Sequence, residues 1–342
     1  MNALELKEYI KRPEYDFMRQ NPHLGDKLIL VGLGGSHAYG TYIEGVSDVD
    51  VRSIAVNSKE EILLHKDYGT IVDVNTDTVI YSFEKIIKLL LENNPNTLEI
   101  VFQRPEDYIV LTELGKLLVD VRHAFLSKRC FYTFGGYAND QLRRLDNKSM
   151  RELPQDKQEV HILRSIENAM HTYREKYFEF PDDAIRLYVD ESEREEMLSE
   201  IFMDINLTHY PLRDWKCMWS EMHNIVKDYA KIGKRASNAI THNKVNKHAM
   251  HLVRLLLCAI DILENGTFST HCGSKIPLLM DIRNGKYMGP DGQMLPAFHE
   301  MVAELDNKLA LAFERTELPD KPDMSIINPM ICQVNEFVVR NT

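Results

Sequence analysis

The sequence predicts an α+β protein with an N-terminal mixed-sheet domain, residues 1–112, and a mostly helical C-terminal domain, residues 113–342. Up to about residue 110, short apolar or alternating segments are separated by turn residues, which is typical of strands mixed with helices. Beyond residue 112 the apolar residues recur with helical spacing. We therefore expect a small sheet followed by a helical bundle.

The elements of the first domain follow from local patterns. Residues 1–20 predict a short helix that Asn21 and Pro22 close. Strands are expected over residues 28–33, 49–56 and 76–83, and a helix over 84–91. A turn-rich linker is expected between the second and third strands.

The second half shows few strand signals. Helices are expected over residues 113–145, 157–178, 194–204, 213–231, 244–264 and 298–314. The strongly acidic stretch 182–200 is interpreted as a solvated face or an inserted loop, and residues 265–297, rich in glycine and proline, as irregular.

Composition narrows the class of protein. A formal net charge of −11 argues against a protein that coats nucleic acid non-specifically, because such binding depends on cation–phosphate contacts. The 5 cysteines form no CxxC pair, which is typical of free thiols in a reducing compartment. The N-terminus does not resemble a secretory signal, and the most apolar helix contains charged residues. We expect a cytoplasmic protein without membrane spans.

One constellation points to chemistry. The turn Gly34-Gly35-Ser36 follows the apolar strand 28–33, and Asp48 and Asp50 follow in an alternating segment. Residues two apart on a strand point to the same face, so the two carboxylates are expected side by side. Two negative charges at so short a distance repel each other unless a cation neutralises them, and Mg²⁺ prefers carboxylate oxygens as ligands. Glycines also let backbone N–H groups approach a phosphate, to which the Ser36 hydroxyl can add a donor. The combination predicts metal-assisted phosphoryl transfer.

The motifs GSHAYGT (residues 35–41) and SDVDVR (residues 47–52) resemble the nucleotidyltransferase domain of the DNA polymerase β superfamily. In its fuller form the pattern is similar to predicted nucleotidyltransferases that are associated with RNA ligases in bacteria and phages. The similarity continues through residues 77–102, 135–145 and 247–266, so it covers most of the chain from about 30 to 266. The acidic stretch 182–200 does not match this pattern and is a candidate insertion.

The resemblance implies transfer of a nucleoside monophosphate from an NTP, with ATP as a candidate, to an acceptor hydroxyl, with release of pyrophosphate. Asp48 and Asp50 would bind two Mg²⁺ ions, with Mn²⁺ as an alternative. The superfamily implies a third metal-binding carboxylate on a neighbouring strand, for which Asp77 is the first candidate and Asp73 the second. We expect residues 1–112 to form the catalytic domain and residues 113–342 to bind substrate.

Nucleotide-binding residues are expected in two places. Gly35 and Ser36 would hold the β- and γ-phosphates, and His37 is either a substrate contact or a turn residue. Lys247, His251 and Arg254 recur at helical spacing on one stripe. That stripe is either a solvated face or a set of groups that grip the triphosphate or the acceptor, and the resemblance favours the second interpretation.

The acceptor is less defined by the sequence. The association with RNA ligases implies an RNA end, and the stretches 122–151 and 227–254 are locally basic, as an RNA-binding surface or a solvated helix face would be. AMP transfer to a protein hydroxyl is the alternative acceptor chemistry. A non-catalytic nucleotide or RNA sensor, or a toxin–antitoxin partner, is the alternative class, and retention of both aspartates and the serine counts against it. The oligomeric state is left open.

Overall fold

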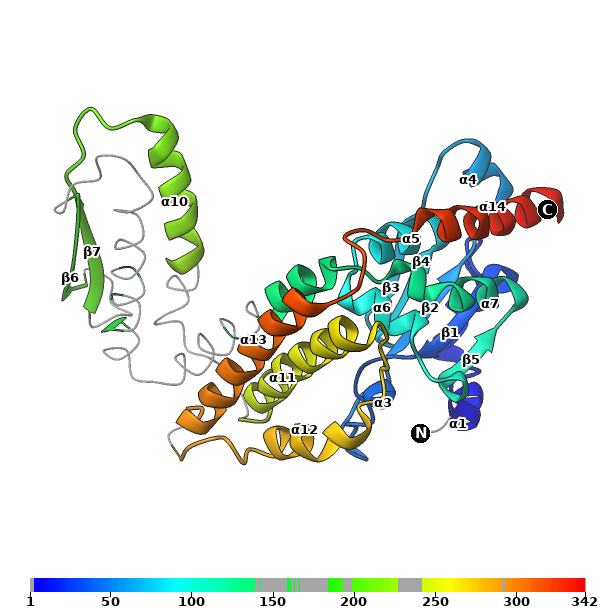
Figure 1. Cartoon of the computed structure of the whole chain (residues 1–342), viewed down its shortest axis with the longest axis horizontal. Coiled ribbons are helices and arrows are strands. Elements are labelled where there is room, and N and C mark those ends of the chain that lie inside the picture. The colour runs from blue at the N-terminus through cyan, green and yellow to red at the C-terminus, as the bar shows by residue number, and fades with distance from the viewer. Residues whose placement is uncertain are drawn as a thin grey trace. The chain divides into compact units, whose positions relative to one another are not determined.

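The computed structural model describes residues 3–138, 142, 159–160, 163, 166, 184–192, 199–226, 242–290 and 293–341 (Figure 1). The chain forms two compact units, one of residues 1–141, 247–287 and 296–342 and the other of residues 142–246 and 288–295. This division does not follow the predicted boundary at 112/113, because helices from the C-terminal half belong to the same unit as the sheet. The assignment of residues 1–112 to catalysis and of 113–342 to substrate binding stays a prediction.

The first unit contains a five-stranded sheet in the order β3-β4-β2-β1-β5. Its strands are β1 (Leu28–Leu33), β2 (Val51–Ala55), β3 (Thr70–Asp73), β4 (Thr78–Ser82) and β5 (Tyr108–Leu111). The β2–β4 pair is parallel and the other pairs are antiparallel, so the sheet is mixed. The predicted α+β class is confirmed.

Two strands were not predicted, and two others, β2 and β4, each begin two residues later than predicted. Strands β3 and β5 have only four residues each, which leaves too short a pattern to separate them from turns and loops. The predicted strand 49–56 is β2, but its ladder with β4 begins at the Val51–Thr78 pair. Asp48 and Asp50 therefore precede the strand.

Helices follow the strands closely. In the first half of the chain they are α1 (Ala3–Tyr9), α2 (Phe17–Gln20), α3 (Gly35–Tyr39), α4 (Lys59–Leu63), α5 (Phe83–Leu91), α6 (Pro95–Val101) and α7 (Glu113–Asp120). Their starts have local causes: the Ser82 hydroxyl accepts from Lys85 N at the start of α5, and Ser58 and Glu61 form a capping box on α4. The helix predicted over 84–91 is α5.

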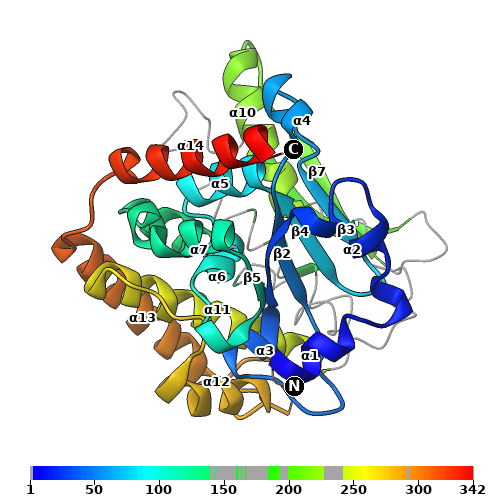
Figure 2. The same cartoon turned by 90° about the vertical axis from the view of Figure 1, so that its right-hand side faces the viewer.

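Both faces of the sheet are covered. On one face, Tyr15, Met18 and Leu24 of the N-terminal segment belong to the same buried cluster as Val31 and Val51. Helices α5 and α7 contact the strands as well, and Figure 2 shows them with α6 beside the sheet. Burial of both faces explains why β1 is apolar almost throughout rather than alternating.

The later helices are α10 (Leu212–Val226), α11 (His242–Asn265), α12 (Ile276–Arg283), α13 (Pro296–Arg315) and α14 (Met324–Asn341). Three of them, α10, α11 and α13, correspond to the predicted helices 213–231, 244–264 and 298–314. The interpretation of residues 265–297 as irregular is wrong for α12, and α14 was not predicted. Residues 129–138, within the predicted helix 113–145, are also helical, whereas the break after α7 divides that prediction. The predicted helix 157–178 lies almost entirely outside the described residues.

The second unit corrects one prediction. Strands β6 (Ile185–Glu191) and β7 (Ser199–Ile205) pair antiparallel in a second sheet, where a helix was expected over 194–204. The strand signal is present in the sequence of β6, because Ile185, Leu187 and Val189 alternate with more polar residues. The acidic stretch 182–200 is therefore in part a paired strand rather than only an inserted loop.

None of the helices in the described part of the chain is both long enough and apolar enough to cross a membrane.

Candidate functional site

The predicted site residues of the N-terminal half meet at one end of the sheet. Strand β1 is antiparallel to β2, and β2 is parallel to β4. The carboxyl end of β1 and the amino ends of β2 and β4 therefore share one edge, where Figure 2 shows helix α3. The glycine turn after β1, Asp50 before β2 and Asp77 before β4 are brought together by this topology.

The glycine turn is fitted to Asp50. Gly34 N donates to the Asp50 carbonyl oxygen at 2.8 Å. Gly35 has a φ of +52°, and a Cβ on it would lie 1.8 Å from Oδ2 of Asp50. Only glycine combines this left-handed conformation with so close an approach. Gly35 is thus required to admit the Asp50 carboxylate, independently of any phosphate.

Arg52 joins the two carboxylates. Its Nη2 lies 3.2 Å from Oδ1 of Asp50 and its Nη1 lies 3.5 Å from Oδ1 of Asp77. Nη1 also donates to the Asp77 carbonyl oxygen at 2.7 Å. The side chains of Asp50 and Arg52 are each 18% exposed, whereas that of Asp77 is 55% exposed. The guanidinium is therefore a partly buried counter-charge between two acids.

The guanidinium of Arg52 does not fully compensate the negative charge of the two acids. Burial and a hydrogen bond with Asp77 raise the pKa of Asp50 from 3.8 to about 6, although Arg52 and Lys247 lower it. A carboxyl with such a pKa is ionised at neutral pH only at a cost in free energy. The pair is consequently short of positive charge, and Lys247 of α11 is close enough to contribute some of it.

The two candidates for the third carboxylate occupy different environments. Asp73 ends β3, and its Oδ2 accepts from the backbone and the hydroxyl of Thr76 at 2.9 and 2.7 Å, which fixes the β3–β4 turn. Asp77 closes that turn in a left-handed conformation, with a φ of +44°, and faces Asp50. The geometry favours Asp77, whose catalytic role stays a prediction.

The remaining predicted residues of this half lie nearby in sequence but differ in surroundings. Asp48 is exposed and Ser36 is half-buried in α3. The His37 ring stacks on Tyr42, with centroids 4.8 Å apart, and burial lowers the pKa of His37. Their predicted roles in metal and nucleotide binding stay predictions.

A divalent cation fits the residues present. Asp50 and Asp77 supply hard oxygen ligands, and the raised pKa of Asp50 reports an unmet need for positive charge at that point. Within the described ranges no three His, Cys, Asp or Glu side chains form a ready-made metal site. Asp48 therefore does not complete a three-carboxylate cluster with the pair in this structure, and Arg52 contacts both acids.

The three predicted residues on the stripe of helix α11 lie in different environments. Lys247 is exposed, whereas Arg254 is only 7% exposed and is buried against Tyr39. His251 accepts from Nη2 of Arg254 at 2.6 Å, and burial holds the pKa of His251 well below its usual value. The interpretation of this stripe as a solvated face is therefore wrong for Arg254 and His251. Nucleotide binding by the three residues stays a prediction.

Sequence reasoning assigned no role to several residues that shape the site. Arg283 of α12 donates to the Thr41 carbonyl oxygen at 2.9 Å and to the Ser47 hydroxyl at 3.1 Å, and so fixes the loop that leads to Asp48. Gln103 donates to the Leu33 carbonyl oxygen just before the glycine turn. Only for Arg52 was a signal available, since it lies two residues after Asp50 and was thus expected on the same face.

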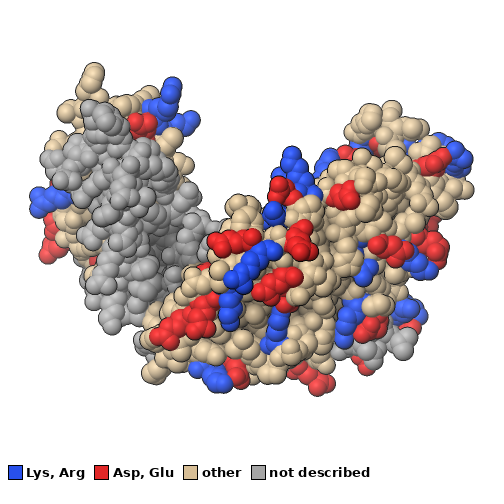
Figure 3. All heavy atoms as spheres, viewed as in Figure 1, with Lys and Arg blue, Asp and Glu red and all other residues tan. Residues whose placement is uncertain are grey.

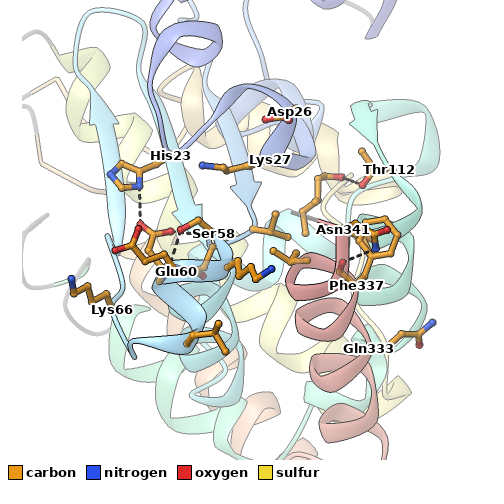
Figure 4. A pocket seen from close by; sticks show the side chains of 18 of the residues that line it. His23, Asp26, Lys27, Ser58, Glu60, Lys66, Thr112, Gln333, Phe337 and Asn341 are labelled. Carbon is orange, nitrogen blue, oxygen red and sulfur yellow. Dashed lines mark hydrogen bonds and ion pairs between the residues drawn. The ribbon is translucent and has the colours of Figure 1, made fainter.

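A large cavity lies elsewhere. It has a volume of about 1450 Å³ and is lined by residues at the opposite end of β1 and β2, including Lys27 and Ser58, and by Phe337 of α14 (Figure 4). His23 and Glu61 form an ion pair at its wall. None of the predicted site residues lines this cavity, so size alone does not identify the reactive centre.

The surface charge seen in Figure 3 does not indicate a binding surface beyond the site. On the face of the first unit in Figure 3, acidic and basic side chains are interspersed rather than gathered by sign. Much of the two locally basic stretches, 122–151 and 227–254, lies outside the described residues. An RNA-binding surface there stays a prediction.

A mixed sheet with a glycine turn and facing carboxylates at one edge defines the class of polymerase-β-like nucleotidyltransferases. Residues 7–206 match the family described as the RNA repair pathway DNA polymerase beta family, RlaP. The chain belongs to this family and is a nucleotidyltransferase. The match includes residues 182–200, which the sequence analysis took as a candidate insertion.

No curated protein and no solved structure gives a significant match.

Gly35→Ala should displace the Asp50 carboxylate, because the added Cβ and Oδ2 cannot occupy the same space. We expect nucleotide transfer to fall by about 100-fold, the order that a displacement of 1 Å can cost. Steady-state transfer rates measure the loss.

Gly45→Ala is the matched control. Gly45 also has a left-handed φ of +74°, but a Cβ there meets nothing within 4 Å. Both variants should lose about 1–2 kcal/mol of stability from backbone strain, but only the first should lose activity. Equal activity of the two variants would contradict the close fit of Gly35 to Asp50.

Asp50→Asn should stabilise the metal-free protein in a pH-dependent way. The folded-state pKa of Asp50 is raised to about 6, so its ionisation opposes folding once the pH rises above the unfolded value of 3.8. In chelator, we expect a gain of roughly 1–3 kcal/mol above pH 6 and none below about pH 4. Urea unfolding at both pH values measures it. A gain that is constant with pH would show that Asp50 is not the strained acid.

Proposed function

We propose that this protein transfers a nucleoside monophosphate from an NTP to the hydroxyl of an RNA end, with Mg²⁺ held by Asp50 and Asp77 and with Asp48 joining them as a ligand when the metal binds. The observation that supports it most strongly is the Asp50–Asp77 pair held against the glycine turn. The family description, which names an RNA repair pathway, supports RNA as acceptor.

The bound metal would supply charge neutralisation of the triphosphate and activation of the acceptor hydroxyl. Asp50 holds its carboxylate at the turn, where Gly35 leaves room for it and the Gly34 N–H fixes its backbone. Asp77 accepts the proton of the attacking hydroxyl or orients that hydroxyl for attack on the α-phosphorus. The P–O bond to pyrophosphate breaks as the new ester bond forms.

The surrounding cations have separate parts in this scheme. Arg52 balances the two acids before substrate binds, and its guanidinium would be available to phosphate oxygens when a metal supplies that charge instead. Lys247, exposed on α11 and near Asp50, is suited to contact the departing pyrophosphate. Ser36 at the start of α3 adds a hydroxyl donor for the β- or γ-phosphate.

Incubation with each α-labelled NTP and Mg²⁺, with and without RNA, tests the proposal. We expect label on RNA only, and loss of label in Asp50→Asn and Asp48→Asn. Asp26→Asn, at the opposite end of the sheet, is the matched control and should retain full activity. Label on protein instead would assign the alternative acceptor, AMP transfer to a side chain. Label on nothing, with an intact fold, would favour a nucleotide or RNA sensor.

Replacement of the two candidate third carboxylates separates their roles. Asp77→Ala should slow transfer by about 100-fold or more with little change in the KM for NTP, because Asp77 acts on the nucleophile. Asp73→Ala should cost stability through the lost turn hydrogen bonds and leave the rate nearly unchanged. The reverse order of rates would move the assignment to Asp73.

A further inference from the structure

A buried network joins helix α11 to helix α3. The Cζ atom of Arg254 lies 3.3 Å from the centroid of the Tyr39 ring, and the Tyr39 hydroxyl donates to Glu99. Tyr39, Glu99 and Arg254 are exposed by 4%, 7% and 7% respectively. On its other side, Arg254 donates to His251, whose ring meets that of Tyr137 edge-on. The network thus links three helical segments and the end of α3.

The charges in this network depend on one another. Burial alone would lower the pKa of Arg254, but Tyr39 and Glu99 raise it above its usual value. Burial raises the pKa of Tyr39 well above its usual value, so the phenol stays neutral and donates its proton to Glu99. Removal of one buried charge would leave the other uncompensated, so the three side chains are held as a unit.

Helix α3 has little means of fixing its own position. It has five residues, Gly35–Tyr39, too few for a helix to be stable alone. Its first residue lies against the Asp50 carboxylate, and its last is Tyr39. The segment after α11 holds the same end, because Cys272 N donates to the Tyr39 carbonyl oxygen at 3.2 Å. A Cβ on Gly40 would lie 2.8 Å from Nε2 of His271, so the packing there is close.

We propose that Arg254 is a positioning residue, which holds α3 through Tyr39 so that Gly35 and Ser36 stand correctly against Asp50. The inference rests on the proposed function of that turn. In this role Arg254 does not contact the nucleotide, whereas the sequence analysis favoured a contact of the α11 stripe with the triphosphate or the acceptor. The glycine turn then takes its functional position only when α11 packs on α3.

Amide hydrogen exchange tests the positioning without any assay of transfer. In Arg254→Met, peptides that contain residues 35–41 should exchange about 10-fold faster or more, because the end of α3 is released. Glu264→Gln is the control, since Glu264 lies on the same helix but is exposed and takes no part in the network. It should leave residues 35–41 unchanged. Unchanged exchange in Arg254→Met would overturn the proposal, whatever the protein transfers.

Should Arg254→Met fail to fold, Arg254→Lys retains a charge but loses the planar stack on Tyr39. It should give the same local exchange at residues 35–41 with a smaller amplitude. Exchange that rises equally over the whole chain, rather than at this segment, would show a merely structural role and overturn the proposal.

A double-mutant cycle with Tyr39→Leu separates positioning from substrate contact. If Arg254 acts through Tyr39, each single variant should slow transfer by about 100-fold and the double variant no further. A direct contact of Arg254 with nucleotide predicts additive losses instead, which would overturn the proposal.

Rescue of an Arg254 variant by free guanidinium ion is a further test of the positioning role. Arg254 lines a cavity of about 240 Å³, which offers a way in for the free ion. Below denaturing concentrations, guanidinium should restore transfer in Arg254→Ala, while neutral urea should not. Recovery of the slow exchange of residues 35–41 by the same ion would support positioning, and recovery of neither would contradict it.

Discussion

The burial of the Asp50 carboxylate beside Asp77 is the constraint on which this end of the sheet depends. Parallel pairing of β2 with β4 brings the two acids together, and burial raises the pKa of Asp50 to about 6. Nothing in folding favours such a pair, which costs stability although Arg52 contacts both acids. Strain of this kind at a turn that only glycine can form is typical of a site kept for its chemistry.

The C-terminal half of the chain is part of this site and not an appendage to it. Arg254 of α11 reaches α3 through Tyr39, and Arg283 of α12 fixes the loop from Thr41 to Ser47. Both arginines are nearly inaccessible to solvent. The two motif segments that flank this loop are therefore each held by a buried cation from a distant part of the sequence. This arrangement explains why helices beyond residue 247 share one compact unit with the sheet.

The sequence predicted what depends on local pattern. Strand β1, helix α5 and the glycine turn follow from apolar runs, caps and turn residues within a few positions. The pairing of Asp77 with Asp50 depends on which strands are neighbours, and a single sequence does not specify strand order or register. The burial of Arg254 was missed for a similar reason, because a polar stripe looks alike whether water or a tyrosine ring covers it. The β6–β7 pair shows the opposite failure, since its alternation was present and was overlooked.

The central claim is that Asp50 and Asp77 form a metal-binding pair at the glycine turn. A crystal structure with Mn²⁺ and a non-hydrolysable NTP tests it most directly, because the anomalous signal locates the ion without assumptions about the fold. We predict an ion bound by oxygens of both Asp50 and Asp77, with the Arg52 guanidinium withdrawn from its contacts with them and phosphates at Gly35 and Ser36. An ordered nucleotide bound elsewhere, with the Asp50–Arg52–Asp77 contacts unchanged and no ion beside them, would contradict the account.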